Sequence, residues 1–163
     1  MTFCSYTKGC RVVSSGHGYP NGLLLHSDGR LYVPHIATGR AHVYQPDQET
    51  GSLVKVADVD ASYPMDNLAE DANGDIFAAA FPRAIDNMAY VKSPFGKVPA
   101  ATVLRIRRAK GSDTAYEWEK VLEDRDGEVL PAMTTVVHDA ATGRLFLSGK
   151  SLLGAQRGTL ACD

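Results

Sequence analysis

The sequence has 163 residues and a formal net charge of −2, and this length suits one domain with a real hydrophobic core. Apolar residues make up 44% of it and charged residues 22%, an ordinary globular composition that excludes wholesale disorder. The near-neutral charge disfavours a nucleic-acid-binding protein, and the longest apolar stretch, residues 76–82, is too short for a transmembrane segment.

The first residues predict no targeting signal. Residues 1–8 lack a basic region followed by an apolar run, so we expect no signal peptide. The three cysteines, Cys4, Cys10 and Cys162, are an odd number. Either all three are reduced thiols, or one of them has lost its partner. None belongs to a Cys-x-x-Cys pair, so we expect no zinc site built from them.

Residues 22–59 are divided by short polar turns into apolar runs of strand length. The runs cover residues 23–26, 31–36, 41–45 and 52–59. The Asp-Gly pair at 28–29, between two of these runs, is a strong hairpin signal. A helix is disfavoured because Gly or Pro interrupts every window before a 3.6-residue period develops. The pattern therefore predicts a four-stranded antiparallel meander.

The same pattern recurs around two later turn glycines. Gly29 and Gly74 are 45 residues apart, and Gly143 follows Gly74 by 69 residues. The longer spacing fits an insertion between Pro82 and Pro99. A repeat of about 40–50 residues with four short strands is typical of a β-propeller blade. The alternative is an antiparallel sandwich whose three hairpins are similar by chance.

The sequence thus predicts an all-β fold, namely a single, incomplete β-propeller domain over residues 1–163. We expect roughly three four-stranded antiparallel blades, at about residues 11–60, 63–123 and 129–163. Because complete propellers have about four to eight blades, such an arc leaves sheet faces open. Either the chain is part of something larger, or it self-associates to cover these faces.

The first strand of each predicted blade begins with oxygen-bearing side chains. Counting back eight residues from each turn glycine gives Asn21, Asp66 and Thr135, and Asn67 and Thr134 lie beside them. In a radial repeat these positions converge on one axis, so we expect them to share a site. Amide and carboxylate oxygens without sulfur or imidazole suit a hard cation, calcium more than magnesium. Alternatively, Asn21 and Asn67 cap strand-entry turns, a role that asparagine fills well.

Several segments carry a family resemblance. Pro-Asn-Gly-Leu at 20–23 and Asp-Gly-Arg-Leu-Tyr-Val at 28–33 are similar to a signature shared by gluconolactonases, strictosidine synthase-like proteins and paraoxonases. The segments that resemble the paraoxonase/arylesterase pattern are residues 65–71, 74–77, 101–106 and 160–163. The resemblance runs in order through nearly the whole chain. It corresponds to the C-terminal half of that family's six-bladed propeller.

This resemblance implies a calcium-dependent hydrolase of lactones and aryl esters. Asn21, Asp66 and Asn67 fall on positions that hold the family's catalytic calcium, and Asp66 could also assist the attacking water or act as a nucleophile. The positions that fall on or near the family's substrate pocket are Tyr19, Phe81, Met88 and Thr134. The family's remaining calcium ligands and its histidine pair belong to blades that this sequence does not contain.

The resemblance also bears on the cysteines and on the cellular location. Cys162 falls on the family's C-terminal half-cystine, whose partner lies near the N-terminus of a full-length member and is missing here. Members are usually secretory, although this sequence shows no export signal. Two hypotheses follow. The chain is either part of a hydrolase that acts on a small ester or lactone, or a non-catalytic propeller fragment that binds a partner.

Overall fold

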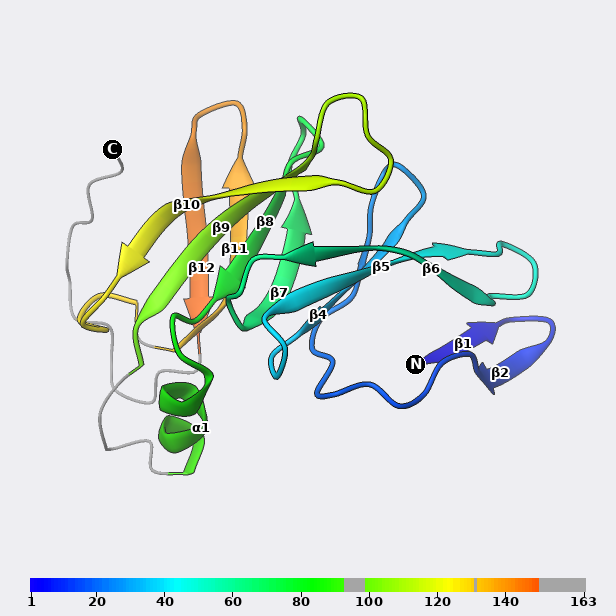
Figure 1. The fold of residues 1–163 in the computed structure, drawn as a ribbon, viewed down its shortest axis with the longest axis horizontal. Coiled ribbons are helices and arrows are strands. Elements are labelled where there is room, and N and C mark those ends of the chain that lie inside the picture. The colour runs from blue at the N-terminus through cyan, green and yellow to red at the C-terminus, as the bar shows by residue number, and fades with distance from the viewer. Residues whose placement is uncertain (93–98, 131, 150–163) are drawn as a thin grey trace.

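The described part of the chain forms four antiparallel β-sheets, which confirms the predicted all-β class. The computed structural model describes residues 1–92, 99–130 and 132–149 (Figure 1). The first sheet has β3 at Leu24–Leu25, β4 at Leu31–His35, β5 at Arg40–Pro46 and β6 at Leu53–Asp60. The second has β7 at Met65–Glu70, β8 at Ile76–Ala80, β9 at Ala101–Arg108 and β10 at Tyr116–Asp124. Two hairpins complete the set: β11 (Met133–Asp139) with β12 (Arg144–Gly149), and β1 (Thr2–Ser5) with β2 (Gly9–Val12).

The three turn glycines occupy equivalent tight turns. Gly29, Gly74 and Gly143 have φ values of 82°, 80° and 69°, a region that glycine enters at no steric cost. Each donates its backbone N–H to a carbonyl three or four residues earlier. These turns separate β3 from β4, β7 from β8 and β11 from β12. The first sheet therefore has the four-stranded antiparallel meander that the apolar runs and turns of residues 22–59 predicted.

The sheets pack in chain order, with the second sheet between its two neighbours (Figure 1). The first core joins the first and second sheets and contains Tyr32, Val43, Met65, Ile76 and Leu104. A second core lies between the second sheet and the β11–β12 hairpin. β7 and β11 run in the same direction, so both begin at the same end of the stack (Figure 1).

Strand β8 shows how one short sequence builds both cores. All five of its residues are buried. Because side chains alternate between the two faces of a sheet, Ile76, Ala78 and Ala80 enter the first core. Phe77 and Ala79 enter the second core from the opposite face. A strand covered on both faces is a continuous apolar run, which is what Ile-Phe-Ala-Ala-Ala provides.

The N-terminal hairpin is a feature that the sequence did not predict. Cys4 and Cys10 are directly opposed in the β1–β2 ladder and form a disulfide. This corrects the interpretation that all three cysteines are reduced. Cys162, the predicted half-cystine, lies outside the described residues. The ring of Phe3 lies against the backbone of Gly51 and so attaches the hairpin to the first sheet.

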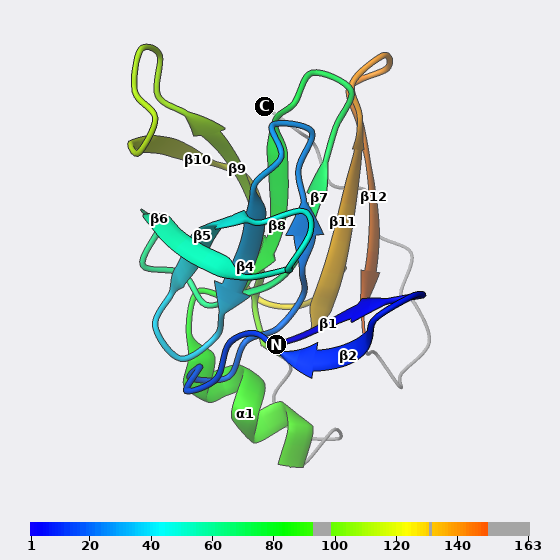
Figure 2. The same cartoon turned by 90° about the vertical axis from the view of Figure 1, so that its right-hand side faces the viewer.

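The insertion predicted between Pro82 and Pro99 contains a helix, α1 (Ala84–Lys92). It extends from the end of the stack where β8 finishes and β7 begins, as both views show (Figures 1 and 2). Across residues 1–92, 99–130 and 132–149, no helix is long and apolar enough to cross a membrane.

Candidate metal centre

Two β-bulges mark the starts of the innermost strands. In β7, Met65 pairs with Ala80 but Leu68 pairs with Ala78, so two residues, Asp66 and Asn67, stand opposite one. In β11 the register shifts between Met133 and Thr135, which makes Thr134 the extra residue. A bulge turns side chains away from the regular pleat and is over-represented beside active sites. We call Asn21, Gly22, Asp66, Asn67, Thr134 and Thr135 the strand-start site.

The side-chain amide of Asn67 connects the two bulges. Its Nδ2 donates to Asp66 Oδ1 at 2.9 Å, to the Thr134 carbonyl at 2.8 Å and to Thr135 Oγ1 at 3.4 Å. Asp66 is only 6% exposed, and Asn67 and Thr134 are half-buried. Three oxygens from two strands thus converge around one nitrogen atom. The structure therefore brings together Asp66, Asn67 and Thr134, three of the predicted site residues.

Gly22 brings the third strand entry to the same place. A Cβ added to Gly22 would lie 2.6 Å from Asn67 Oδ1 and 3.1 Å from Asn67 Cα, so only glycine leaves room here. The neighbouring Asn21 is half-buried and donates its backbone N–H to the Pro34 carbonyl at 3.0 Å. Asn21 therefore lies one residue from the contact with Asn67. The segment before β3 thus lies against the start of β7, which in turn contacts the start of β11.

Gly22→Ala is expected to destabilise the protein by about 1–3 kcal/mol, because the new methyl group must displace Asn67 and its hydrogen bonds. Urea unfolding followed by circular dichroism measures this loss. Gly18→Ala is the matched control, since its Cβ would meet only the Cβ of Ala37, at 3.9 Å, and should change stability by less than about 0.5 kcal/mol. Equal losses in the two variants would show that Gly22 is not a close-contact position.

The donor set of the strand-start site matches a hard cation. No group of three or more His, Cys, Asp or Glu side chains that could hold a metal occurs among the described residues. A metal here would therefore depend on Asp66 together with amide, hydroxyl and backbone oxygens. Calcium accepts such ligands, whereas zinc prefers sulfur and imidazole nitrogen. By donor chemistry the residues fit calcium, with Asn21, Asp66 and Asn67 as the side chains that would hold it.

The other predicted residues are placed differently. Tyr19 is 77% exposed and has a φ of 52°, and its carbonyl accepts the Ile36 N–H. Met88 is exposed on α1. Phe81 directly follows β8 and is completely buried, so its ring belongs to the protein interior.

A group of three histidines was not predicted. The His35 ring lies 4.2 Å from the His42 ring and 5.5 Å from the His17 ring, measured between centroids. His35 Nδ1 donates to the Gly18 carbonyl at 3.3 Å, while the buried Nε2 has no hydrogen-bond partner among the described residues. Burial and the nearby His42 lower the pKa of His35, and burial, the N-terminal charge and His42 lower that of His17. Both rings are therefore neutral in the folded protein near pH 7.

The protein is expected to lose stability as the pH falls below the ordinary histidine value of about 6.5. In that range the unfolded chain takes up protons that folded His17 and His35 resist, so acid favours unfolding. Above that pH this contribution is fully present. Urea unfolding at a series of pH values measures the slope, and His35→Gln should make it shallower. If the slope of stability against pH were unchanged in His35→Gln, the pH dependence would not come from His35.

No protein-family model and no curated protein matches this chain.

Proposed function

We propose that the strand-start site binds calcium and belongs to a hydrolase of lactones and aryl esters. The observation that carries the proposal is the meeting of three strand entries around the Asn67 amide, with the buried Asp66 carboxylate beside it. The resemblance of the Asn21 and Asp66–Asn67 segments to the paraoxonase/arylesterase pattern supports the same chemistry. Sequential sheets that pack face to face, each beginning at one end, also support the finer proposal of three blades of a six-bladed propeller.

Each residue of the site has a role in this proposal. Asn21 and Asn67 would hold the ion through neutral amide oxygens, and Asp66 would supply the charged ligand. A bound calcium ion would supply Lewis-acid chemistry, polarising the substrate carbonyl and stabilising the negative charge that develops as water adds. Asp66 takes the proton of the attacking water, and the Asn67 Nδ2 hydrogen bond to Oδ1 holds the carboxylate in position.

The substrate side of the proposal rests on apolar surface at the same end of the stack. Tyr19 and Met88 are exposed, and α1, which carries Met88, extends from the end where β7 begins (Figure 1). Exposed aromatic and thioether side chains suit an aryl group or an acyl chain. The small ester or lactone would thus bind with its carbonyl toward Asp66.

Hydrolysis of phenyl acetate and of a δ-lactone, with calcium or with a chelator, tests this function. We expect turnover that requires calcium, is abolished by Asp66→Asn and is unchanged by Asp126→Asn, whose side chain is exposed. Turnover that persists in Asp66→Asn would contradict the role of this carboxylate.

A second candidate is a non-catalytic module that associates with a second copy of the chain. Val137 and Phe146 are paired across β11 and β12, and both are exposed, at 48% and 62%. Two apolar side chains side by side on an open sheet face favour such contact. Light scattering distinguishes the candidates. A dimer that dissociates in Phe146→Ser, together with no calcium-dependent turnover, would favour the module over the hydrolase.

A further inference from the structure

The N-terminal hairpin and the outer face of the first sheet border an apolar pocket of about 200 Å³. Leu24 and Tyr32 belong to the first core. Because side chains alternate between the faces of a sheet, Leu25 and Leu31, which pair with each other across β3 and β4, lie on the outer face. These two leucines line the pocket, together with Phe3, Val13, Leu23 and Leu53. We call this space the hairpin pocket.

The wall of the pocket on the hairpin side is held by contacts within the chain. The Cys4–Cys10 disulfide closes the β1–β2 hairpin and limits its movement. The Phe3 ring lies so close to Gly51 that a Cβ at this glycine would collide with it. The hairpin is thus fixed against the sheet, and the pocket is preformed, as small-molecule sites usually are.

The charged groups at this pocket are already bound to other parts of the chain. The Asp47 carboxylate accepts the Thr50 N–H at 2.7 Å and the Glu49 N–H at 3.1 Å, which directs it into its own turn. The Met1 nitrogen donates to the Ser14 carbonyl. Among the described residues that line the pocket there is no lysine, arginine or histidine. A charged ligand would therefore lose hydration without gaining a partner of opposite charge.

Two exposed leucines border the open side of the pocket. Leu23 and Leu25 are 59% and 63% exposed, although both are large apolar side chains. An apolar molecule that covers them removes this surface from water, which favours binding. Apolar protein cavities of about 150 Å³, lined by leucine, isoleucine and phenylalanine, take up benzene. The hairpin pocket, at about 200 Å³, therefore admits a molecule of similar size.

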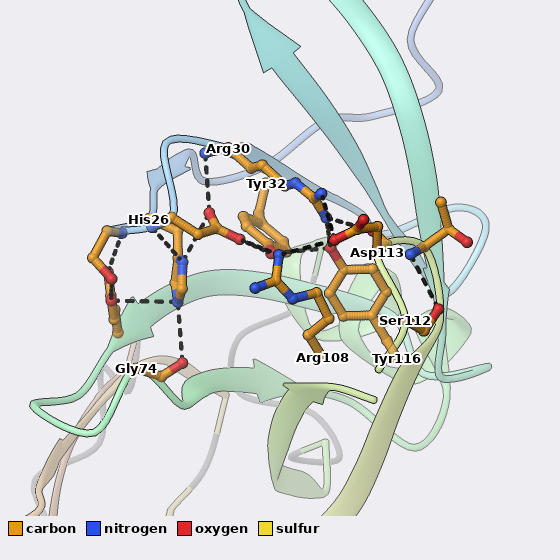
Figure 3. Close-up of polar contacts among 12 residues, drawn as sticks. His26, Arg30, Tyr32, Gly74, Arg108, Ser112, Asp113 and Tyr116 are labelled. Carbon is orange, nitrogen blue, oxygen red and sulfur yellow. Dashed lines mark hydrogen bonds and ion pairs between the residues drawn. The ribbon is translucent and has the colours of Figure 1, made fainter. Parts of the chain in front are cut away.

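A second hollow, between the β3–β4 and β7–β8 turns, has the opposite character (Figure 3). Its polar groups pair with one another. His26 Nε2 lies 3.0 Å from the Gly74 carbonyl oxygen. Tyr32 donates to Asp28 Oδ2 at 3.2 Å, and its hydroxyl oxygen lies 3.1 Å from that of Tyr116. A ligand would have to break these bonds to enter this hollow, whereas the hairpin pocket offers apolar surface that is already exposed.

We propose that the hairpin pocket binds a compact, uncharged apolar molecule, for which toluene is a model. The ligand would lie between Phe3 of the hairpin and Leu31 of the sheet, and it would cover Leu23 and Leu25. The volume limits the ligand to about the size of one ring. This inference does not depend on the proposed hydrolase function, because the hairpin pocket and the strand-start site share no residue.

Titration with toluene, followed by the amide NMR shifts of residues 23–31, tests the proposal. We expect saturable shifts in the wild type. Benzoate has a carboxylate in place of the methyl group and should bind at least about tenfold more weakly. Leu25→Asp should weaken toluene binding at least about tenfold, because it places a carboxylate at the open side of the pocket. Val137→Asp is the matched control, since Val137 is an exposed apolar residue of β11 outside the pocket, and it should bind toluene as the wild type does.

The remaining outcomes also decide the question. Leu25→Gln serves if Leu25→Asp does not fold, and it should also weaken binding because the amide must give up water beside the ligand. Cys4→Ser combined with Cys10→Ser should weaken binding about two- to fivefold, because the hairpin wall is less constrained, and an unchanged affinity would overturn the location of the site. The proposal would also be overturned by the absence of saturable toluene shifts in the wild type, by equal affinities for toluene and benzoate, or by equal toluene binding in Leu25→Asp and Val137→Asp.

Discussion

Replacing Phe81 by alanine is expected to lower the free energy of unfolding by about 3–5 kcal/mol. Phe81 is among the largest fully buried side chains, and its backbone N–H donates to the Pro64 carbonyl at 2.9 Å. Removing the ring forfeits its transfer free energy and leaves a cavity that the surrounding strands fill only in part. Urea unfolding measures the change in stability.

Phe146→Ala provides the control for this prediction, because Phe146 is 62% exposed on β12 and should contribute little to stability. The pair also tests the resemblance, which places Phe81 near a substrate pocket. If Phe81→Ala were no less stable than Phe146→Ala and raised only the KM for aryl esters, Phe81 would line a pocket and not the core.

Asp71→Ala is expected to lower the free energy of unfolding by about 3 kcal/mol, because this carboxylate organises the β7–β8 turn and joins it to β11. Asp71 Oδ1 accepts the backbone N–H groups of Asn73 and Asp75, both at 2.9 Å, and Oδ2 accepts His138 Nδ1 at 2.7 Å. Its side chain is 1% exposed. Burial raises the pKa of Asp71, but the His138 ring and the two N–H groups outweigh it and lower that pKa.

Asp139→Ala is the matched control, because Asp139 holds the corresponding β11–β12 turn through Thr142 and Ala141 but is only half-buried. We expect a clearly smaller loss than for Asp71→Ala in urea unfolding at pH 7. Because the folded pKa of Asp71 is depressed, its contribution is present above the ordinary aspartate pKa and is lost as the pH falls below it. Similar losses of stability in the two variants at pH 7 would contradict this role of Asp71. So would a difference in stability between them that does not become smaller in acid.

Much of the fold could be predicted because its turns are local. Asp28-Gly29, Asn73-Gly74 and Thr142-Gly143 each fix a positive φ at the glycine, and the apolar runs on either side then pair as hairpins. The convergence of the strand starts followed from the same spacing.

The remaining features depend on contacts between distant parts of the chain. The bulges at Asp66–Asn67 and Thr134 are register shifts, which no local pattern reveals. The hydrogen bond from Arg30 to Tyr116 joins residues that meet only after the first two sheets have packed. The Cys4–Cys10 disulfide was missed because three cysteines leave the pairing undetermined.

Calcium titration of the wild type and of Asp66→Asn, followed by thermal unfolding, tests the metal assignment most directly. A ligand that binds only the folded chain must raise the Tm as its concentration increases. We predict a saturable rise in the wild type, a weaker effect of magnesium and no rise in Asp66→Asn. A wild-type Tm that is insensitive to millimolar calcium, or an equal rise in both proteins, would contradict the assignment.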